Sequence, residues 1–315
     1  MSAPAIHAVG LERRFGDFVA VAGVDLSVAS GEIYGFLGPN GAGKSTTVRM
    51  LTTLLIPTGG SARVAGHDVE TEADAVRLRI GVALQEAALD PKQTGRELLD
   101  LQGRFYGMSK SERVRRLDQL LPLVDIGDAI DRRIATYSGG MKRRLDLAAA
   151  LVHDPEVLFL DEPTTGLDPI SRAAVWEEIR RLNTELGMTI FLTTQYLEEA
   201  DALADRVGII DRATLVAEGT PADLKRSIGS DLIVIRTEGA NDAAGPALRN
   251  LAGVDRVDIR GDEVVVAVHD GAAAISPVAV ALSDIGIAVR ELTLRTPTLD
   301  DVFLTITGGH LGGDA

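Results

Sequence analysis

One short stretch of sequence constrains the fold of this chain more than any other. A glycine-rich run at residues 38–45 lies directly between an apolar segment, residues 33–37, and a segment with helical periodicity, residues 45–55. A strand that passes through a glycine turn into a helix is a unit of an α/β fold with a largely parallel sheet. Further β-rich runs alternate with helical patterns up to about residue 225 and support this class: residues 32–37, 80–84, 157–160, 189–193 and 206–211.

The glycine-rich run has the pattern G-x4-G-K-S of a phosphate-binding loop (P-loop), and it has the strand before it and the helix after it that such a loop requires. Glycines let successive backbone N–H groups point at phosphate oxygens, and the helix N-terminus adds partial positive charge. Lys44 supplies a charge for the β and γ phosphates, and the Ser45 hydroxyl suits Mg²⁺. We therefore expect a nucleotide site formed by Gly38, Pro39, Asn40, Gly41, Ala42, Gly43, Lys44, Ser45 and Thr46.

A second motif places two carboxylates at the end of another strand. The apolar run at residues 157–160 is followed by Asp161 and Glu162. In a P-loop enzyme Asp161 would hold the magnesium and its water shell, and Glu162 would polarise the attacking water as general base. The structural alternative is that both residues only cap the strand before Pro163. Beside a P-loop, we favour hydrolysis of a nucleoside triphosphate with Mg²⁺ as cofactor.

The remaining motifs distinguish between the classes of P-loop protein. No Asn-Lys-x-Asp motif for reading guanine is present. The run Tyr-Ser-Gly-Gly-Met-Lys-Arg-Arg-Leu-Asp at residues 137–146 resembles the signature of the nucleotide-binding subunits of ABC transporters. A serine N-cap before two glycines at a helix start makes a further anion site. The resemblance implies a head-to-tail homodimer in which Ser138, Gly139 and Gly140 clamp the ATP that a second copy of the chain binds.

The same resemblance assigns roles to three more residues. Gln85, after the strand at residues 80–84, matches the glutamine that in this family touches magnesium and links the site to the membrane subunit. Asp168 matches the loop that crosses the dimer interface. Phe15 matches the aromatic residue that stacks on adenine, although a simple core phenylalanine is the alternative.

The chain departs from the family pattern at Gln195. Most ABC ATPases carry a histidine there that binds the γ phosphate, and a glutamine can donate an amide N–H but cannot shuttle a proton. We expect slow turnover at this site, whereas a degenerate, non-hydrolysing site is the alternative. The run Gln-Tyr-Leu-Glu-Glu-Ala-Asp at residues 195–201 is similar to the daunorubicin-resistance (DrrA-type) ATPases of the drug-export subfamily, as is the closing motif at residues 297–304.

Sequence patterns also divide the chain into domains. A junction at residues 227–230 separates a nucleotide-binding domain, residues 1–228, from a second domain, residues 229–307, and a flexible tail, residues 308–315. Within the first domain, residues 86–153 carry mostly helical patterns and form a helical subdomain. The second domain reads βαββαβ, the ferredoxin-like order, with a tight hairpin at Gly261-Asp262 and a last helix opening at Thr298. Residues 231–315 carry a net charge of −7, which predicts a solvated acidic face, or a surface for docking or dimer regulation.

Composition limits the classes of partner. The 315-residue chain carries 32 Lys and Arg against 46 Asp and Glu, a net charge of −14, and it has no Cys. An acidic chain repels phosphate backbones, so we expect no nucleic-acid partner. Because no apolar run of about 18 residues and no signal peptide are present, we expect membrane contact only through a separate permease. The lack of Cys fits a reducing cytosol.

These observations together predict a peripheral ATPase on the cytoplasmic face of the plasma membrane. We expect it to bind and hydrolyse ATP in a dimer and so to drive a transmembrane permease that exports a hydrophobic drug or natural product. Alternatives are an exporter for an envelope lipid, a polysaccharide or an ion. From other classes, the alternatives are a soluble ABC ATPase without a transport role and a degenerate regulatory subunit.

Overall fold

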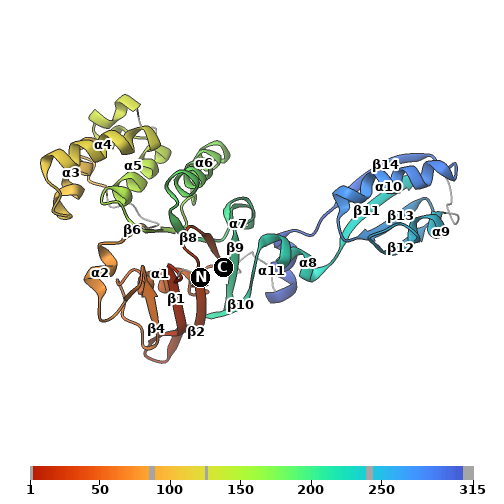
Figure 1. Ribbon diagram of the computed structural model, residues 1–315, viewed down its shortest axis with the longest axis horizontal. Helices are drawn as coiled ribbons and strands as arrows, with labels where there is room; N and C mark the ends of the chain where they lie inside the picture. Colours follow the sequence, from red (N-terminus) through yellow and green to blue (C-terminus); the bar gives the residue numbers. More distant parts are fainter. Residues whose placement is uncertain (1–2, 85–88, 125–126, 239–243, 308–315) are drawn as a thin grey trace. The chain divides into compact units, whose positions relative to one another are not determined.

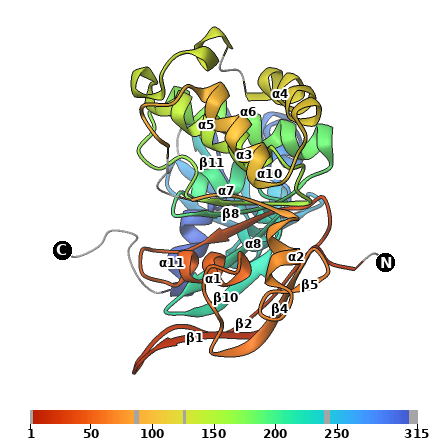
Figure 2. The same ribbon diagram turned by 90° about the vertical axis from the view of Figure 1, so that its left-hand side faces the viewer.

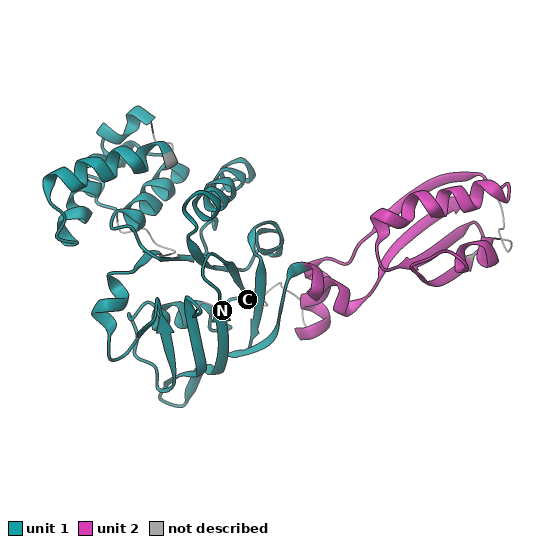
Figure 3. Ribbon diagram, viewed as in Figure 1, with its two compact units in different colours: residues 1–221 teal, residues 222–315 magenta. Residues whose placement is uncertain are grey.

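A computed structural model describes residues 3–84, 89–124, 127–238 and 244–307 of the chain. The chain divides into two compact units, residues 1–221 and residues 222–315 (Figure 3). Helix α8 (Pro221–Ile228) therefore falls almost wholly in the second unit, whereas the sequence analysis placed the boundary after it. Each unit has its own hydrophobic core.

A six-stranded sheet forms the centre of the first unit, with the strand order β10-β9-β3-β8-β7-β6. All neighbouring strands are parallel except β10, which pairs with β9 in the antiparallel sense. The strands are β3 (Ile33–Leu37), β6 (Ile80–Ala83), β7 (Val157–Asp161), β8 (Thr189–Thr194), β9 (Arg206–Asp211) and β10 (Thr214–Gly219). Every residue of β3, β7 and β8 is buried, which is why these segments are continuous apolar runs. The α/β class is confirmed.

A second sheet in this unit, in the order β2-β1-β4-β5, is entirely antiparallel and was not predicted. Its strands are β1 (Ile6–Phe15), β2 (Phe18–Val28), β4 (Gly59–Val64) and β5 (His67–Asp68). Its buried side chains share one core with α1 (Lys44–Leu51) and with one face of the central sheet (Figure 2). Phe191 lies in the middle of that core, with its ring centroid 5.5 Å from Tyr34 and 5.6 Å from Phe159.

Helices cover the opposite face of the central sheet (Figure 1). They are α3 (Gly95–Phe105), α4 (Lys110–Val124), α5 (Gly139–Leu151), α6 (Pro169–Leu186) and α7 (Leu197–Leu203). Short 3-10 turns lie at Gly127–Asp131 and Ile134–Thr136. A further short helix, α2 (Ala73–Arg77), precedes β6. Helices α3, α4 and α5 form the helical subdomain that the sequence predicts. α3 begins with a capping box in which the Thr94 hydroxyl accepts from the Glu97 N–H and the Glu97 carboxylate accepts from the Thr94 N–H.

The second unit contains a four-stranded antiparallel sheet in the order β12-β13-β11-β14. Its elements are β11 (Asp231–Thr237), α9 (Ala244–Arg249), β12 (Val254–Arg260), β13 (Glu263–Val268), α10 (Gly271–Asp284) and β14 (Val289–Arg295), followed by α11 (Leu299–Thr307). This order confirms the ferredoxin-like prediction. Thr298 and Asp301 bond reciprocally at the start of α11. Among the described residues, no helix is both long enough and apolar enough to cross a membrane.

Candidate functional site

The glycine-rich loop joins β3 to α1 at the carboxyl edge of the central sheet. Gly43, the N-cap of α1, has φ +112°, and Gly41 has φ +81°, values that residues with a side chain rarely adopt. A Cβ on Gly43 would lie 2.5 Å from the carbonyl oxygen of Ala20, and one on Gly38 would lie 2.3 Å from that of Ile210. The loop therefore depends on glycine at Gly38 and Gly43, which bring the backbone close to its neighbours.

Lys44 begins α1 and is almost fully buried, with 4% of its surface exposed. Its Nζ donates to the carbonyl oxygens of Gly38 at 2.7 Å and Pro39 at 3.1 Å. The same atom lies 3.6 Å from Oε1 of Glu162. Burial lowers the pKa of Lys44, and the charge of Glu162 opposes that shift. The ammonium group is thus held at the loop by two carbonyls and one carboxylate.

Asp161 is the last residue of β7, and its carboxylate accepts hydrogen bonds from two hydroxyl groups in distant parts of the chain. Ser45 Oγ donates to Asp161 Oδ1 at 3.2 Å, and Thr193 Oγ1 donates to the same oxygen at 2.5 Å. Among the described residues, no group of three or more His, Cys, Asp and Glu side chains could hold a metal ion by itself. Mg²⁺ commonly takes one or two protein oxygens and completes its shell with phosphates and water, so Ser45 and Asp161 fit this ion.

Glu162 follows directly and has an unusual backbone, with φ +48°. Its N–H donates to Thr193 Oγ1 at 3.0 Å and to the Thr193 carbonyl oxygen at 3.1 Å. Thr165 Oγ1 donates to Glu162 Oε2 at 3.2 Å. A non-glycine residue in the left-handed region persists only where its surroundings hold it, and these bonds fix the carboxylate beside Lys44.

A cleft of about 550 Å³ opens over the loop. It is lined by Phe18, Ala20, Pro39, Asn40, Gly41, Gly43, Lys44, Ser45, Thr46, Glu162, Thr165 and Gln195. The structure therefore brings Gln195, which follows β8, together with the loop and Glu162. Sequence reasoning missed Phe18 and Thr165 as lining residues.

Two exposed aromatic rings flank the β1–β2 turn near this cleft. Phe15 and Phe18 pair across the turn, and they are 48% and 63% exposed. The Arg13 guanidinium lies 4.5 Å from the centroid of the Phe15 ring. Phe18 lines the cleft, whereas Phe15 does not. Exposure excludes the core-phenylalanine alternative for Phe15, and its stacking on adenine stays a prediction.

The signature residues and Asp168 do not line the cleft of their own chain. Ser138 is the N-cap of α5, and its hydroxyl accepts from the Met141 N–H at 3.2 Å. Asp168 caps α6 in the same way, and the Ser171 hydroxyl is the main cause that lowers the Asp168 pKa. Both helix starts are therefore preformed outside the cleft. Gln85 lies outside the described residues.

A buried polar network connects these motifs, and sequence reasoning did not find it. Arg143 in α5 donates through Nε to the Pro163 carbonyl at 3.0 Å and through Nη1 to the Leu84 carbonyl at 2.7 Å. Glu199 in α7 is fully buried and accepts from the Thr164 hydroxyl at 2.9 Å. Burial raises its pKa. Such residues carry no local sequence signal, because their partners are backbone carbonyls or distant side chains.

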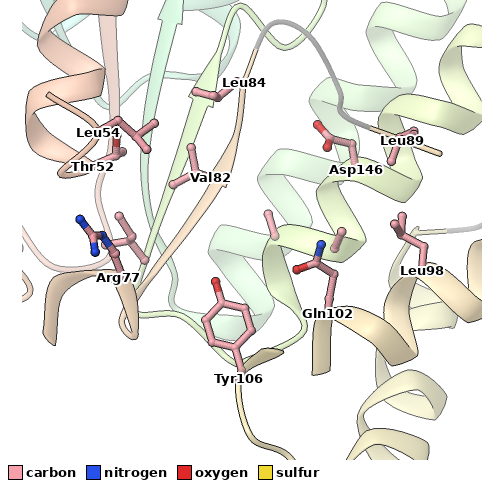
Figure 4. A pocket seen from close by; sticks show the side chains of 13 residues that line it. Thr52, Leu54, Arg77, Val82, Leu84, Leu89, Leu98, Gln102, Tyr106 and Asp146 are labelled. Carbon is pink, nitrogen blue, oxygen red and sulfur yellow. The ribbon is translucent and has the colours of Figure 1, made fainter. Parts of the chain in front are cut away.

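A second hollow, a groove of about 370 Å³, lies between β6, the end of α1 and the helices α3 and α5 (Figure 4). Its wall includes Leu54, Val82, Leu98 and Tyr106, with Asp146 as its acidic residue. Burial raises the pKa of Asp146 to about 6, although Arg143 Nη1 lies only 3.2 Å away. The groove thus combines aliphatic side chains with polar ones, among them Arg77, Gln102 and Asp146.

Comparison with known proteins agrees with the geometry. Residues 21–165 match the ABC transporter family, and residues 219–307 match the C-terminal domain of DrrA1-3-like ATP-binding proteins. The daunorubicin resistance ATP-binding protein DrrA3 of Streptomyces coeruleorubidus is 50% identical over 309 residues, which are 98% of this chain and 97% of that protein.

Two further similarities extend this comparison. The daunorubicin/doxorubicin resistance ATP-binding protein DrrA of Streptomyces peucetius is 48% identical, over 96% of this chain and 92% of that protein. The solved structure of cbiO1 from Clostridium perfringens, part of the ABC transporter complex cbiONQ, has a TM-score of 0.67 at 25% identity and covers 72% of this chain and 94% of that one. The chain belongs to the ATP-binding, ATP-hydrolysing subunits of ABC transporters, in the DrrA group.

Proposed function

We propose that this chain binds Mg-ATP between two copies of itself and uses its hydrolysis to drive export of a hydrophobic drug or natural product through a separate transmembrane permease. The observation that carries the proposal is the convergence of Lys44, Ser45, Glu162 and Gln195 on one cleft, which the loop glycines shape. Asp161 joins this group through its hydrogen bond from Ser45. Each of these groups suits one part of phosphoryl transfer to water.

The roles follow from the positions of the side chains. Lys44 exchanges its two carbonyl partners for β and γ phosphate oxygens. Ser45 and Asp161 would hold the magnesium ion, which would neutralise phosphate charge. Glu162, fixed by Thr165, orients and polarises the attacking water as general base. Gln195 donates an amide hydrogen bond to the γ phosphate.

A second copy of the chain would complete the site. Ser138, Gly139 and Gly140 present the N-terminus of α5, a 13-residue helix, and lie outside the cleft of their own chain. In a head-to-tail dimer they would clamp the γ phosphate held by the partner, and Asp168 would line the interface. We propose adenine stacking for Phe15 and a magnesium contact for Gln85 on the family pattern alone.

The groove beside β6 is proposed to receive the permease at the cytoplasmic face of the membrane. It is concave and lined by both apolar and polar side chains, which suits a short amphipathic segment of another subunit. Drug export as the task is supported by the relatives named for daunorubicin and doxorubicin resistance. No contact with nucleic acid is proposed, because the net charge is −14.

Magnesium-dependent phosphate release tests the site. We expect Glu162→Gln to lose release by at least about 100-fold while it still binds ATP, because the amide keeps the shape of the side chain but cannot act as general base. The exposed Glu177 on α6 provides the matched control, and Glu177→Gln should release phosphate like the unaltered chain. If the unaltered chain releases no phosphate alone or with its permease in lipid vesicles, the site is a regulatory one. If doxorubicin does not enter such vesicles but a labelled envelope lipid is moved, drug export is wrong.

A further inference from the structure

The sheet of the second unit has two unlike faces. The helices α9 and α10 pack on one face, where Ile233, Ile235, Val264 and Val266 belong to the hydrophobic core. The alternate residues of the same strands lie on the other face and are not part of that core. Within the described part of this unit, α9 and α10 make the main helix contacts with the sheet, and both belong to the core side. We refer to it as the open face.

Strand register places the residues of the open face in rows across the two central strands. Leu232 of β11 pairs with Ala267 of β13 in one row, and Val234 pairs with Val265 in the next. These aliphatic side chains are half-buried or buried. Two rows of apolar side chains therefore run through the middle of a face that no core element covers.

The next row carries opposite charges in place of aliphatic groups. Arg236 of β11 pairs with Glu263 of β13, and the Arg236 side chain is exposed. The outer strands add polar and charged groups, because this face also carries Arg295, Thr293 and Glu291 of β14 and Arg256 and Asp258 of β12. The two central strands therefore have an apolar centre with a cationic and an anionic group side by side at one end, and two arginines flank the other end.

The pattern of the two central strands is complementary to itself under one two-fold rotation. When the axis runs parallel to the strands, between β11 and β13, the β11 of each copy faces the β13 of the other copy. Residues of the same row then lie opposite one another. Arg236 then faces Glu263 of the second copy, and the aliphatic rows face each other. An axis perpendicular to the strands would instead place Arg236 over Leu232, which leaves a charge on an apolar surface.

We propose that the open face binds the open face of a second copy of this chain through the strand-parallel two-fold arrangement. The inference rests on the homodimer under Proposed function and adds a second contact to it. Aligned packing of two sheets keeps the central strands in contact while sheet twist separates the edges. The outer charges therefore count less. Arg295 of β14 would face Arg256 of the other copy, and Arg256 pairs with Asp258 of its own strand at 2.8 Å, which offsets part of that repulsion.

The area of the open face indicates whether this contact alone could hold two chains together. Four strands about 4.8 Å apart and about seven residues long cover roughly 450 Å² on each copy. The two copies together would bury about 900 Å², which is below the ~1,200 Å² of a stable complex. The open faces alone would not hold two chains together. Between chains already joined by ATP, the second contact acts at high effective concentration and strengthens the dimer.

The test uses the full chain with Glu162→Gln as the parent, so that ATP is not consumed. The natural sequence has no Cys, so one cysteine introduced at Ala315 carries a donor or an acceptor dye. Energy transfer then reports the chain concentration at which half of the copies are dimeric with Mg-ATP. Arg236→Glu and Glu263→Arg each place like charges opposite one another in both symmetric contacts. Each should raise this concentration roughly tenfold at low salt, and less in 1 M NaCl.

Mixing the two variants separates a contact between copies from a change within one copy. In an equimolar mixture, the carboxylate introduced at position 236 of one variant would face the guanidinium introduced at position 263 of the other, so both contacts become attractive again. In each variant alone, by contrast, both contacts are repulsive. The mixture of Arg236→Glu and Glu263→Arg should therefore return to within about twofold of the parent concentration. A loss of fold stability within one copy cannot be repaired by mixing, so recovery would identify the facing pair.

The matched control is Arg290→Glu, which makes the same charge change on the helix-covered side of β14. It should leave the dimer concentration unchanged. Single variants that behave like the parent, or a mixture that stays as weak as its components, would overturn the proposed contact and leave the ATP-dependent dimer intact. A parent chain that forms no dimer with Mg-ATP would overturn the homodimer itself, and this inference with it.

Discussion

The charge state of Asp146 gives the most direct test of the electrostatics around the groove. Asp146 and Arg143 form an ion pair in which both partners are mostly buried, with 15% and 12% of their side chains exposed. Burial raises the pKa of Asp146 to about 6 from 3.8, and burial also lowers the pKa of Arg143. Both groups shift toward their neutral forms, so pairing does not fully offset the loss of water. The perturbation is Asp146→Asn, which keeps the shape and removes the charge.

The sign and the magnitude follow from linkage. Between the unfolded pKa of 3.8 and the folded pKa of about 6, the native state of Asp146 binds more protons than the unfolded state. The contribution of Asp146 to the free energy of unfolding is therefore fully present below pH 3.8 and is lost as the pH rises through about 6. The shift of about 2.2 units corresponds to about 3 kcal/mol in total. Between about pH 5 and about pH 7.5, roughly 1.4 kcal/mol of it would be lost.

Urea unfolding at a series of pH values measures this effect. Trp176 is the only tryptophan in the chain and lies in α6, so its fluorescence reports the first unit alone. The free energy of unfolding of the unaltered chain, minus that of Asp146→Asn, should fall by roughly 1.4 kcal/mol from about pH 5 to about pH 7.5. All other titrations cancel in this difference. A difference that stays flat, or that rises with pH, would refute the claim that burial outweighs pairing at Asp146.

Three further predictions address the nucleotide site. Gly38→Ala should weaken ATP binding by at least about tenfold, since its Cβ would lie 2.3 Å from the Ile210 carbonyl oxygen; Gly229→Ala, whose Cβ meets no atom within 4 Å, should bind ATP normally in equilibrium dialysis. Gln195→His should raise the single-turnover rate several-fold, because imidazole can accept and donate a proton, and an unchanged rate would contradict the slow-turnover hypothesis. Glu199→Gln should keep near-normal thermal stability, whereas Glu199→Ala should lose about 2–4 kcal/mol in urea unfolding, because buried donors lose their acceptor.

The parts of the fold that the sequence predicts are those in which burial is complete. β7 and β8 lie in the middle of the central sheet, so each reads as an unbroken apolar run and its bounds can be predicted closely. The antiparallel sheet was missed for the opposite reason. β1 has only alternate residues buried and ends in Glu12, Arg13, Arg14 and Phe15, which resembles a polar surface segment. Pairing with β2 and β4 makes it a strand, and that pairing is not local.

The same distinction between local and non-local signals applies to the residues of the candidate site. Lys44, Ser45, Asp161 and Glu162 were predicted because each stands in a contiguous motif beside a strand end. Phe18 was not predicted, since its place at the cleft depends on how the β1–β2 turn lies against the loop. Local sequence identifies the groups that do chemistry, and tertiary contacts decide which further groups surround them.

Arg143 explains how the groove and the hydrolytic site can influence one another. Its guanidinium is a rigid plane, and it donates to the carbonyl after β6 at Leu84 and to the carbonyl after Glu162 at Pro163. Because one planar group holds both carbonyls, a partner in the groove that displaces the end of β6 must either move Pro163 or break one of these bonds. A buried guanidinium that loses a partner is costly, so the first response is favoured. Asp146 keeps Arg143 in place from the groove side, and its charge therefore bears on the geometry around Glu162.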